Sequence, residues 1–184
     1  MSQNPDAITV PGRAYLHLAP YGTAFPADES TAMNAAFKEA GYTKEEGTQL
    51  SSDPNFVQVY SHQADTPTRV FKSTEQVKLN ITMQEWRGKT FQSAFGGGTI
   101  TQITPGHFRY DPPAGTTDPV AAILKIVDGT KVYLFCFPRV RSTSGVSIDL
   151  DRTSEAGLPM GLEAEGNQPW YLLTNDPLFD PTAS

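Results

Sequence analysis

The sequence predicts a mainly β fold, either a β-sandwich or a partly open barrel, flanked by one main α-helix, with an extended loop and terminal arms. Apolar and polar residues alternate in several short stretches, which is the two-residue period of half-buried strands. The 15 glycines and 15 prolines are spread along the chain, as in proteins with many strands joined by turns. A length of 184 residues suits a single domain with its own core, so we expect residues 1–184 to form one domain.

The N-terminal third is predicted to contain an arm, a strand and a helix. Residues 1–12 are expected to form the arm, because the first six are polar. A strand follows and ends at Pro20. We then expect a short helix, capped by Ser30 or Thr31 and stopped by Gly41. The apolar residues of this helix are Met33, Ala36, Phe37 and Ala40.

Residues 41–67 are predicted to form a long, weakly packed loop or hairpin. Charged residues, serine, aspartate and proline dominate this stretch. The residues that interrupt the polar pattern are Phe56, Val57, Val59 and Tyr60. Long exposed loops often have a function, so this segment is a candidate binding surface.

The clearest pattern lies between residues 68 and 98, where a long alternating strand leads directly into a short amphipathic helix. One face of the strand carries Val77, Leu79, Ile81 and Met83, and the other carries Gln76, Lys78, Asn80, Thr82 and Gln84. The period then changes, since Phe91 and Phe95 are four residues apart and Trp86 lies one turn before them. The three glycines at positions 96–98 provide the helix stop.

The rest of the chain is predicted to be strands and a C-terminal arm. Residues 99–103 read as a strand, and 110–119 as a loop rich in turn residues. Residues 121–127 and 131–141 are predicted to form a hairpin around an Asp-Gly turn. The second hairpin strand is apolar on both faces, so we expect a sheet to cover one face and a helix the other. Residues 177–184 are expected to be the arm.

Two further strands are predicted after the hairpin, and both present carboxylates. In the first strand, Val146, Ile148 and Leu150 oppose Asp149 and Asp151. In the second, Leu158, Met160, Leu162 and Ala164 oppose Glu163 and Glu165. The simplest interpretation of these carboxylates is that they lie on a strand face exposed to solvent. The alternative is that the carboxylates, or the polar row from Gln76 to Gln84, face inward in a ring of subunits and repel phosphates.

Composition and motifs argue against several functions. The net charge of −6 and pI near 5.0 do not suit a surface that grips nucleic acid. The N-terminus has no signal-peptide pattern, and no segment has the roughly 20 apolar residues of a membrane span. The single cysteine, Cys136, lies in an apolar run and reads as a buried structural thiol.

No catalytic or metal-binding motif is present. His17, His62 and His107 lie far apart in the sequence and have no metal-ligand spacing. The run of glycines at 96–98 follows a helix, whereas a phosphate-binding loop precedes one. No nucleophile elbow occurs. We therefore expect no enzymatic activity, no cofactor and no metal.

The chain resembles the major tail tube proteins of bacteriophages with long, non-contractile tails. The residues that carry the resemblance lie between positions 32 and 177, in AFKEAGYTKEEGTQLS, FKSTEQVKLNITMQEWRGKTFQSAFGGG, VYLFCFPRVR, and VSIDLDRTSEAGLPMGLEAE with its PWYLLTNDP close. The resemblance implies a β-sandwich flanked by a helix. It further implies that six copies close into a ring and that rings stack into a tube through which the genome is ejected. We do not expect the immunoglobulin-like domain that follows the sandwich in some relatives.

The resemblance also implies sites and partners. Asp149, Asp151, Glu163 and Glu165 are candidates to line the channel. Ser51, Asp53, Asn55, Phe56 and Gln58 are candidates for a contact between rings. Besides copies of itself, the expected partners are the tape measure, tail tip and tail terminator proteins, with DNA passing through unbound and no insertion into a membrane. The expected location is the virion tail, after assembly in the host cytoplasm.

Two alternatives remain open from the sequence. The chain could be another ring-forming tail component or a secretion-tube protein, because these can share the sandwich. It could also be a β-sandwich binding module, in which Trp86, Trp170 and Tyr171 would form an aromatic platform for a ligand. Against the platform, Trp86 begins a helix and Trp170 enters an apolar run, where core packing is the commoner role.

Overall fold

The computed structural model describes residues 8–148, 150 and 155–182 and confirms the mainly β fold class. Its elements are β1 (Arg13–Pro20), β2 (Lys38–Glu39), β3 (Gln49–Val59), β4 (Arg69–Met83), α1 (Gly88–Ala94), β5 (Thr99–Thr104), β6 (His107–Asp111), β7 (Val120–Asp128), β8 (Lys131–Ser142), β9 (Leu158–Ala164), β10 (Tyr171–Thr174) and the 3-10 helix η2 (Pro177–Phe179). The main antiparallel sheet has the strand order β2-β1-β7-β8-β9-β4-β3, and β10 also pairs with β8. Strands β5 and β6 form a separate ribbon.

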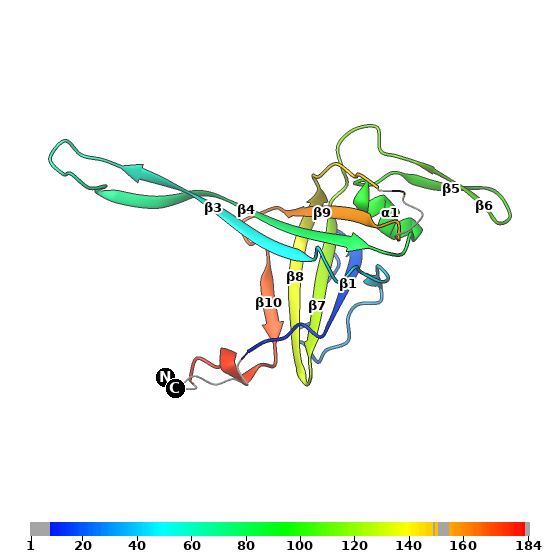
Figure 1. Ribbon diagram of the computed structural model, residues 1–184, viewed down its shortest axis with the longest axis horizontal. Coiled ribbons are helices and arrows are strands. Elements are labelled where there is room, and N and C mark those ends of the chain that lie inside the picture. Colours follow the sequence, from blue (N-terminus) through cyan, green and yellow to red (C-terminus); the bar gives the residue numbers. More distant parts are fainter. Residues whose placement is uncertain (1–7, 149, 151–154, 183–184) are drawn as a thin grey trace.

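The main sheet folds over itself into two crossing layers (Figure 1). One layer contains β1, β7, β8 and β10, and the other contains β3, β4 and β9, which cross the first at a steep angle. The layers remain joined because the C-terminal end of β8 pairs with the end of β9. This arrangement is an open sandwich with orthogonal packing.

The main core lies between the two layers. The apolar row predicted for β4 points inward, since Val77, Leu79, Ile81 and Met83 are each at most 2% exposed. The residues that they pack with include Leu158, Met160 and Leu162 of β9, Leu16 of β1, Leu124 of β7, and Phe137 of β8. The alternation in the sequence therefore predicted the buried face of β4 correctly.

A second apolar cluster covers the opposite face of β7 and β8, and here the predicted helix is wrong. Residues 30–41 contain no helix, and Phe37 packs on this face from an irregular segment. The carboxylate of Asp28 accepts hydrogen bonds from the backbone N–H groups of Ser30 and Thr31, as in an Asx turn or a helix N-cap, but no helix follows this turn. Strand β2 follows, so the chain pairs with β1 instead of coiling.

The predicted helix before the three glycines is confirmed but is shorter than expected. It begins at Gly88, so Trp86 lies outside it. Thr90 and Ala94 form its buried face, and the Thr90 hydroxyl donates to the carbonyl of Ala40 at 2.8 Å. Phe91 and Phe95 are only half-buried, in an aromatic cluster with Tyr110. The helix therefore uses small side chains against the core and aromatic ones at its edge.

The strand predicted around residues 146–150 is wrong for the residues described there. Residues 143–148 and 150 form no strand, although Val146 and Ile148 still pack against the core. An alternating sequence indicates that every second side chain is buried, but it does not show that a neighbouring strand is present for hydrogen bonding. The hairpin of β7 and β8, strand β5 and the carboxylate-bearing strand β9 are confirmed.

Candidate functional site

The most prominent feature is a long hairpin that leaves the body of the protein (Figure 1). Its first strand is β3, where the sequence predicted a contact loop, and its second strand is the N-terminal half of β4. The predicted segment 41–67 therefore contains only one side of the hairpin. We call the outer part, residues 54–74, the distal ribbon. The five predicted contact residues, Ser51, Asp53, Asn55, Phe56 and Gln58, all lie on β3.

Both faces of the distal ribbon are apolar and open to solvent. Cross-strand pairing places Val57 opposite Phe71 on one face, where they are 40% and 42% exposed. Phe56 and Val70 lie on the other face and are 56% and 53% exposed. A two-stranded ribbon with uncovered apolar side chains on both faces is unusual for a monomer and typical of an interaction surface.

The outer edge of β3 has no partner strand within the described part of the chain. This edge runs from Gln49 to Val59 and is the end of the main sheet. Pro54 lies in its middle and removes one N–H donor. Natural proteins cover or shorten such edges, so a long free edge is a surface that another chain can extend.

The outer face of the β3–β4–β9 layer is polar and combines two candidate rows. Lys78 lies opposite Ser51 on one side and Glu163 on the other. The Gln76 amide donates to Glu163 at 2.8 Å, and the Thr143 hydroxyl donates to the same carboxylate at 3.0 Å. The polar row of β4 and Glu163 therefore belong to one surface, which the sequence could not establish.

Glu165 has a different environment from Glu163. Its carboxylate pairs with Arg139 at 2.6 Å and with Arg141 at 2.8 Å. The two arginines face outward because β8 contains one extra residue near Pro138, a bulge that reverses the alternation before Val140. Two positive charges thus offset the negative charge of Glu165. The other predicted carboxylates, Asp149 and Asp151, lie outside the described residues.

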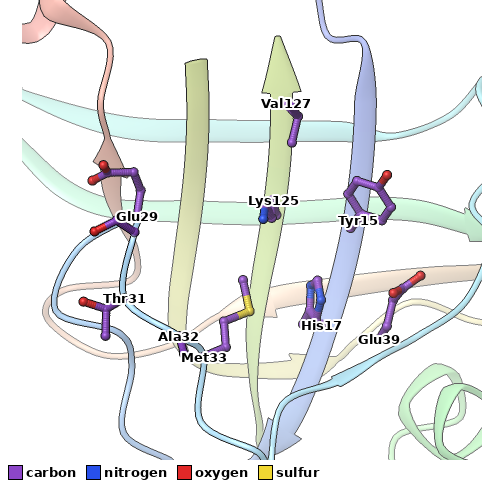
Figure 2. A pocket seen from close by; sticks show the side chains of 10 residues that line it. Tyr15, His17, Glu29, Thr31, Ala32, Met33, Glu39, Lys125 and Val127 are labelled. Carbon is purple, nitrogen blue, oxygen red and sulfur yellow. The ribbon is translucent and has the colours of Figure 1, made fainter. Parts of the chain in front are cut away.

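A shallow hollow of about 490 Å³ lies beside β1, β2 and β7, where His17, Glu39 and Lys125 meet (Figure 2). Burial lowers the pKa of His17, while Glu39 acts to raise it and Lys125 to lower it. His17 Nδ1 is buried and has no partner among the residues described. The nearby hydroxyls of Ser30 and Thr31 donate to Asp28 instead of to His17.

The other candidate groups do not form a binding site. Trp86 packs on Phe91, Trp170 packs on Phe135, and Tyr171 packs on Phe25, so the aromatic platform does not assemble. Burial raises the pKa of the Cys136 thiol to about 11, which makes it unreactive near neutral pH. Across the described ranges, no group of three metal-ligating side chains comes together, and no helix is long and apolar enough to span a membrane.

A second projecting ribbon, formed by β5 and β6, is not predicted from the sequence as a pair of strands. The strand at 99–103 was predicted, but its partner at 107–111 was not. The signal was the Pro105-Gly106 turn between two runs with strand residues, with Gly106 at φ +83°. This ribbon projects from the body at the end opposite to the distal ribbon (Figure 1).

Comparison with known proteins gives one family. A family model described as phage tail tube protein matches residues 1–183. No curated protein matches the chain.

Proposed function

Because the chain belongs to the phage tail tube protein family, we propose that six copies close into a ring and that rings stack into the tube of a long, non-contractile tail. The family makes this chain a structural protein of the virion tail that assembles with itself into a tube. In the proposed particle the tube is the conduit for DNA ejection into the host. The observation that supports this arrangement best is the long free edge of β3 beside an apolar distal ribbon.

Ring closure would use the free edge of β3. A neighbouring subunit that adds a strand there continues the β3–β4–β9 layer from one copy to the next, and the backbone groups of β3 before the distal ribbon, Gln49 to Asp53, gain partners. Identical head-to-tail contacts close into a ring when a whole number of rotations from one subunit to the next makes a full turn. The layer then forms one continuous inner wall.

The polar outer face of this layer would line the channel. The side chains that it presents are Gln49, Ser51, Asp53, Gln76, Lys78, Asn80, Thr82 and Glu163. Most are neutral, and Lys78 lies opposite Glu163, so the surface has little net positive charge to hold phosphates. DNA can slide past such a wall without specific binding. Glu165 contributes less negative charge to the channel than expected, because Arg139 and Arg141 pair with it.

The distal ribbon would form the contact between rings. It extends well away from the body, and its apolar side chains on both faces remain uncovered in one copy. Burial of these side chains between subunits would favour stacking through the hydrophobic effect. We assign Asn55, Phe56 and Gln58 to this contact, whereas Ser51 and Asp53 precede the distal ribbon and belong to the polar face of the layer.

The remaining elements of the proposal concern partners and location. Tape measure, tail tip and tail terminator proteins would contact the lumen and the two ends of the tube. Assembly would take place in the host cytoplasm before the tail joins the virion. The role of a tube subunit requires no enzymatic activity, and the family is one of structural proteins.

Electron microscopy of the purified protein tests the proposal. Samples concentrated at low and moderate salt are examined by negative staining, with light scattering of the same samples. We expect hollow six-fold rings or filaments with a central channel. If the protein stays monomeric even after purified tail tips are added as nuclei, the tube proposal is refuted.

A further inference from the structure

We propose that β5 and β6 form a docking ribbon that receives the distal ribbon of a second copy of this chain. The inference rests on the proposed function, because it names the surface against which the contact between rings is made. It follows from three features of the docking ribbon: its isolation, its fixed base and its apolar outer part.

The docking ribbon is isolated from the main sheet. It pairs only with itself, and all six residues of β5 are exposed. Two-stranded ribbons are marginal in water and need a third element to pack against. For the outer part of this ribbon, no such element occurs among the residues that the structure describes.

The base of the docking ribbon is held firmly. The Tyr110 hydroxyl donates a hydrogen bond to the carbonyl oxygen of Gly97 at 2.9 Å. The Tyr110 ring packs edge-on against the Phe91 ring, with the two ring centroids 5.2 Å apart. Gly98 has φ +94°, and a Cβ there would lie 2.5 Å from the carbonyl oxygen of Asp111. The ribbon therefore projects from a closely packed base.

The apolar face of the docking ribbon continues past the part that the protein covers itself. Ile100 lies opposite Tyr110 near the start of α1, and Phe108 follows on the same face, opposite Gln102. Ile103 is the extra residue of a bulge next to this pair. Phe108 is 66% exposed and Ile103 is 65% exposed. Neighbouring exposed apolar side chains on a rigid ribbon indicate a contact surface.

A second copy fits this surface better than an unrelated partner. The distal ribbon and the docking ribbon extend from opposite ends of the long axis of the molecule (Figure 1). Contacts between two unlike surfaces at opposite ends repeat from copy to copy and build an extended assembly. The face of the distal ribbon that carries Val57 and Phe71 is apolar, as is the docking face around Phe108. Tail tube proteins form such an assembly from copies of themselves.

Cross-linking between two variants that each carry one introduced cysteine tests the contact. Gln102→Cys protein, which carries its new thiol opposite Phe108 on the docking face, is mixed with Val57→Cys protein, assembled, and treated with a short bifunctional maleimide. The native Cys136 is fully buried, so it does not compete for the reagent. Thr101→Cys is the matched control, because Thr101 lies opposite Arg109 on the other face of the same ribbon.

We expect a covalent dimer from the Gln102→Cys and Val57→Cys mixture only after assembly, at a yield at least tenfold above that of the Thr101→Cys and Val57→Cys mixture. Tubes that form normally but give equal yields from both mixtures would overturn the docking contact and leave the tube proposal intact. Wild-type protein that never associates, with or without tail tips, would overturn both proposals.

Discussion

Replacing Phe56 by threonine separates the contribution of the distal ribbon to assembly from its contribution to folding. Threonine keeps the preference for a strand and removes the ring. Phe56 is 56% exposed in the single copy, so just over half of its surface is still available to be buried in the tube. Full burial of such a side chain contributes about 1.5–3 kcal/mol, so the available part contributes roughly 0.8–1.7 kcal/mol per subunit.

The assay is the critical concentration for tube formation, measured by pelleting assembled protein over a series of total concentrations. Because about 1.4 kcal/mol corresponds to a tenfold change in an equilibrium constant, we expect the critical concentration to rise roughly 4- to 17-fold. The free energy of unfolding of the monomer should change by no more than about 0.5 kcal/mol, as for other exposed positions. Tyr42→Thr is the control, since Tyr42 is 74% exposed but lies off the ribbon. An unchanged critical concentration for Phe56→Thr, or an equal rise for Tyr42→Thr, would refute the assignment of Phe56 to the contact between rings.

Three further predictions concern stability. Phe91→Asp puts an unpaired charge into the half-buried aromatic cluster and should lower the free energy of unfolding by at least about 2 kcal/mol in chemical denaturation, so normal stability would contradict the amphipathic-helix assignment. Gly98→Ala should lower the melting temperature more than Gly106→Ala. Both glycines have positive φ, but only a Cβ at position 98 would meet backbone, 2.5 Å from the carbonyl oxygen of Asp111. Equal decreases in melting temperature would show that the base of the β5–β6 ribbon is not tightly packed. The hydrogen bond from the Tyr133 hydroxyl is the main cause of the lowered pKa of Asp176. The ionised carboxylate therefore stabilises the fold above its ordinary pKa, and this stabilisation is lost as the pH falls. The melting temperatures of wild type and Asp176→Asn should differ at pH 7 and converge at acid pH, and a difference that stays constant with pH would contradict this linkage.

Local patterns were reliable where burial on one face decided the structure. The inward row of β4 and the hairpin of β7 and β8 were predicted because alternation and an Asp-Gly turn act over a few residues. The helix expected at 30–41 is absent because β1 offers a pairing edge, and the chain forms strand β2 there at Lys38 and Glu39. The strand around residue 148 failed because burial without a neighbouring strand does not make a sheet.

The candidate site was only partly predictable. The contact residues on β3 were identified from an unusual polar stretch, but their partner strand was not, because pairing with β4 joins positions up to 31 residues apart, as between Gln49 and Asn80. Glu163 and Glu165 looked equivalent in the sequence. Arg139 and Arg141 form ion pairs with Glu165, whereas Glu163, although it lies opposite Arg141, accepts hydrogen bonds from Gln76 and Thr143.

The sequence by itself determined the fold class, the resemblance to tail tube proteins, and the buried faces of the longest strands. Each of these depends on side-chain periodicity or on residue types in order along the chain. The tertiary structure decided which rows share a surface, which carboxylate is neutralised, and which apolar ribbons stay uncovered at opposite ends of the molecule. Those properties depend on contacts between residues distant in sequence, which form only when the sheet folds over itself into two crossing layers.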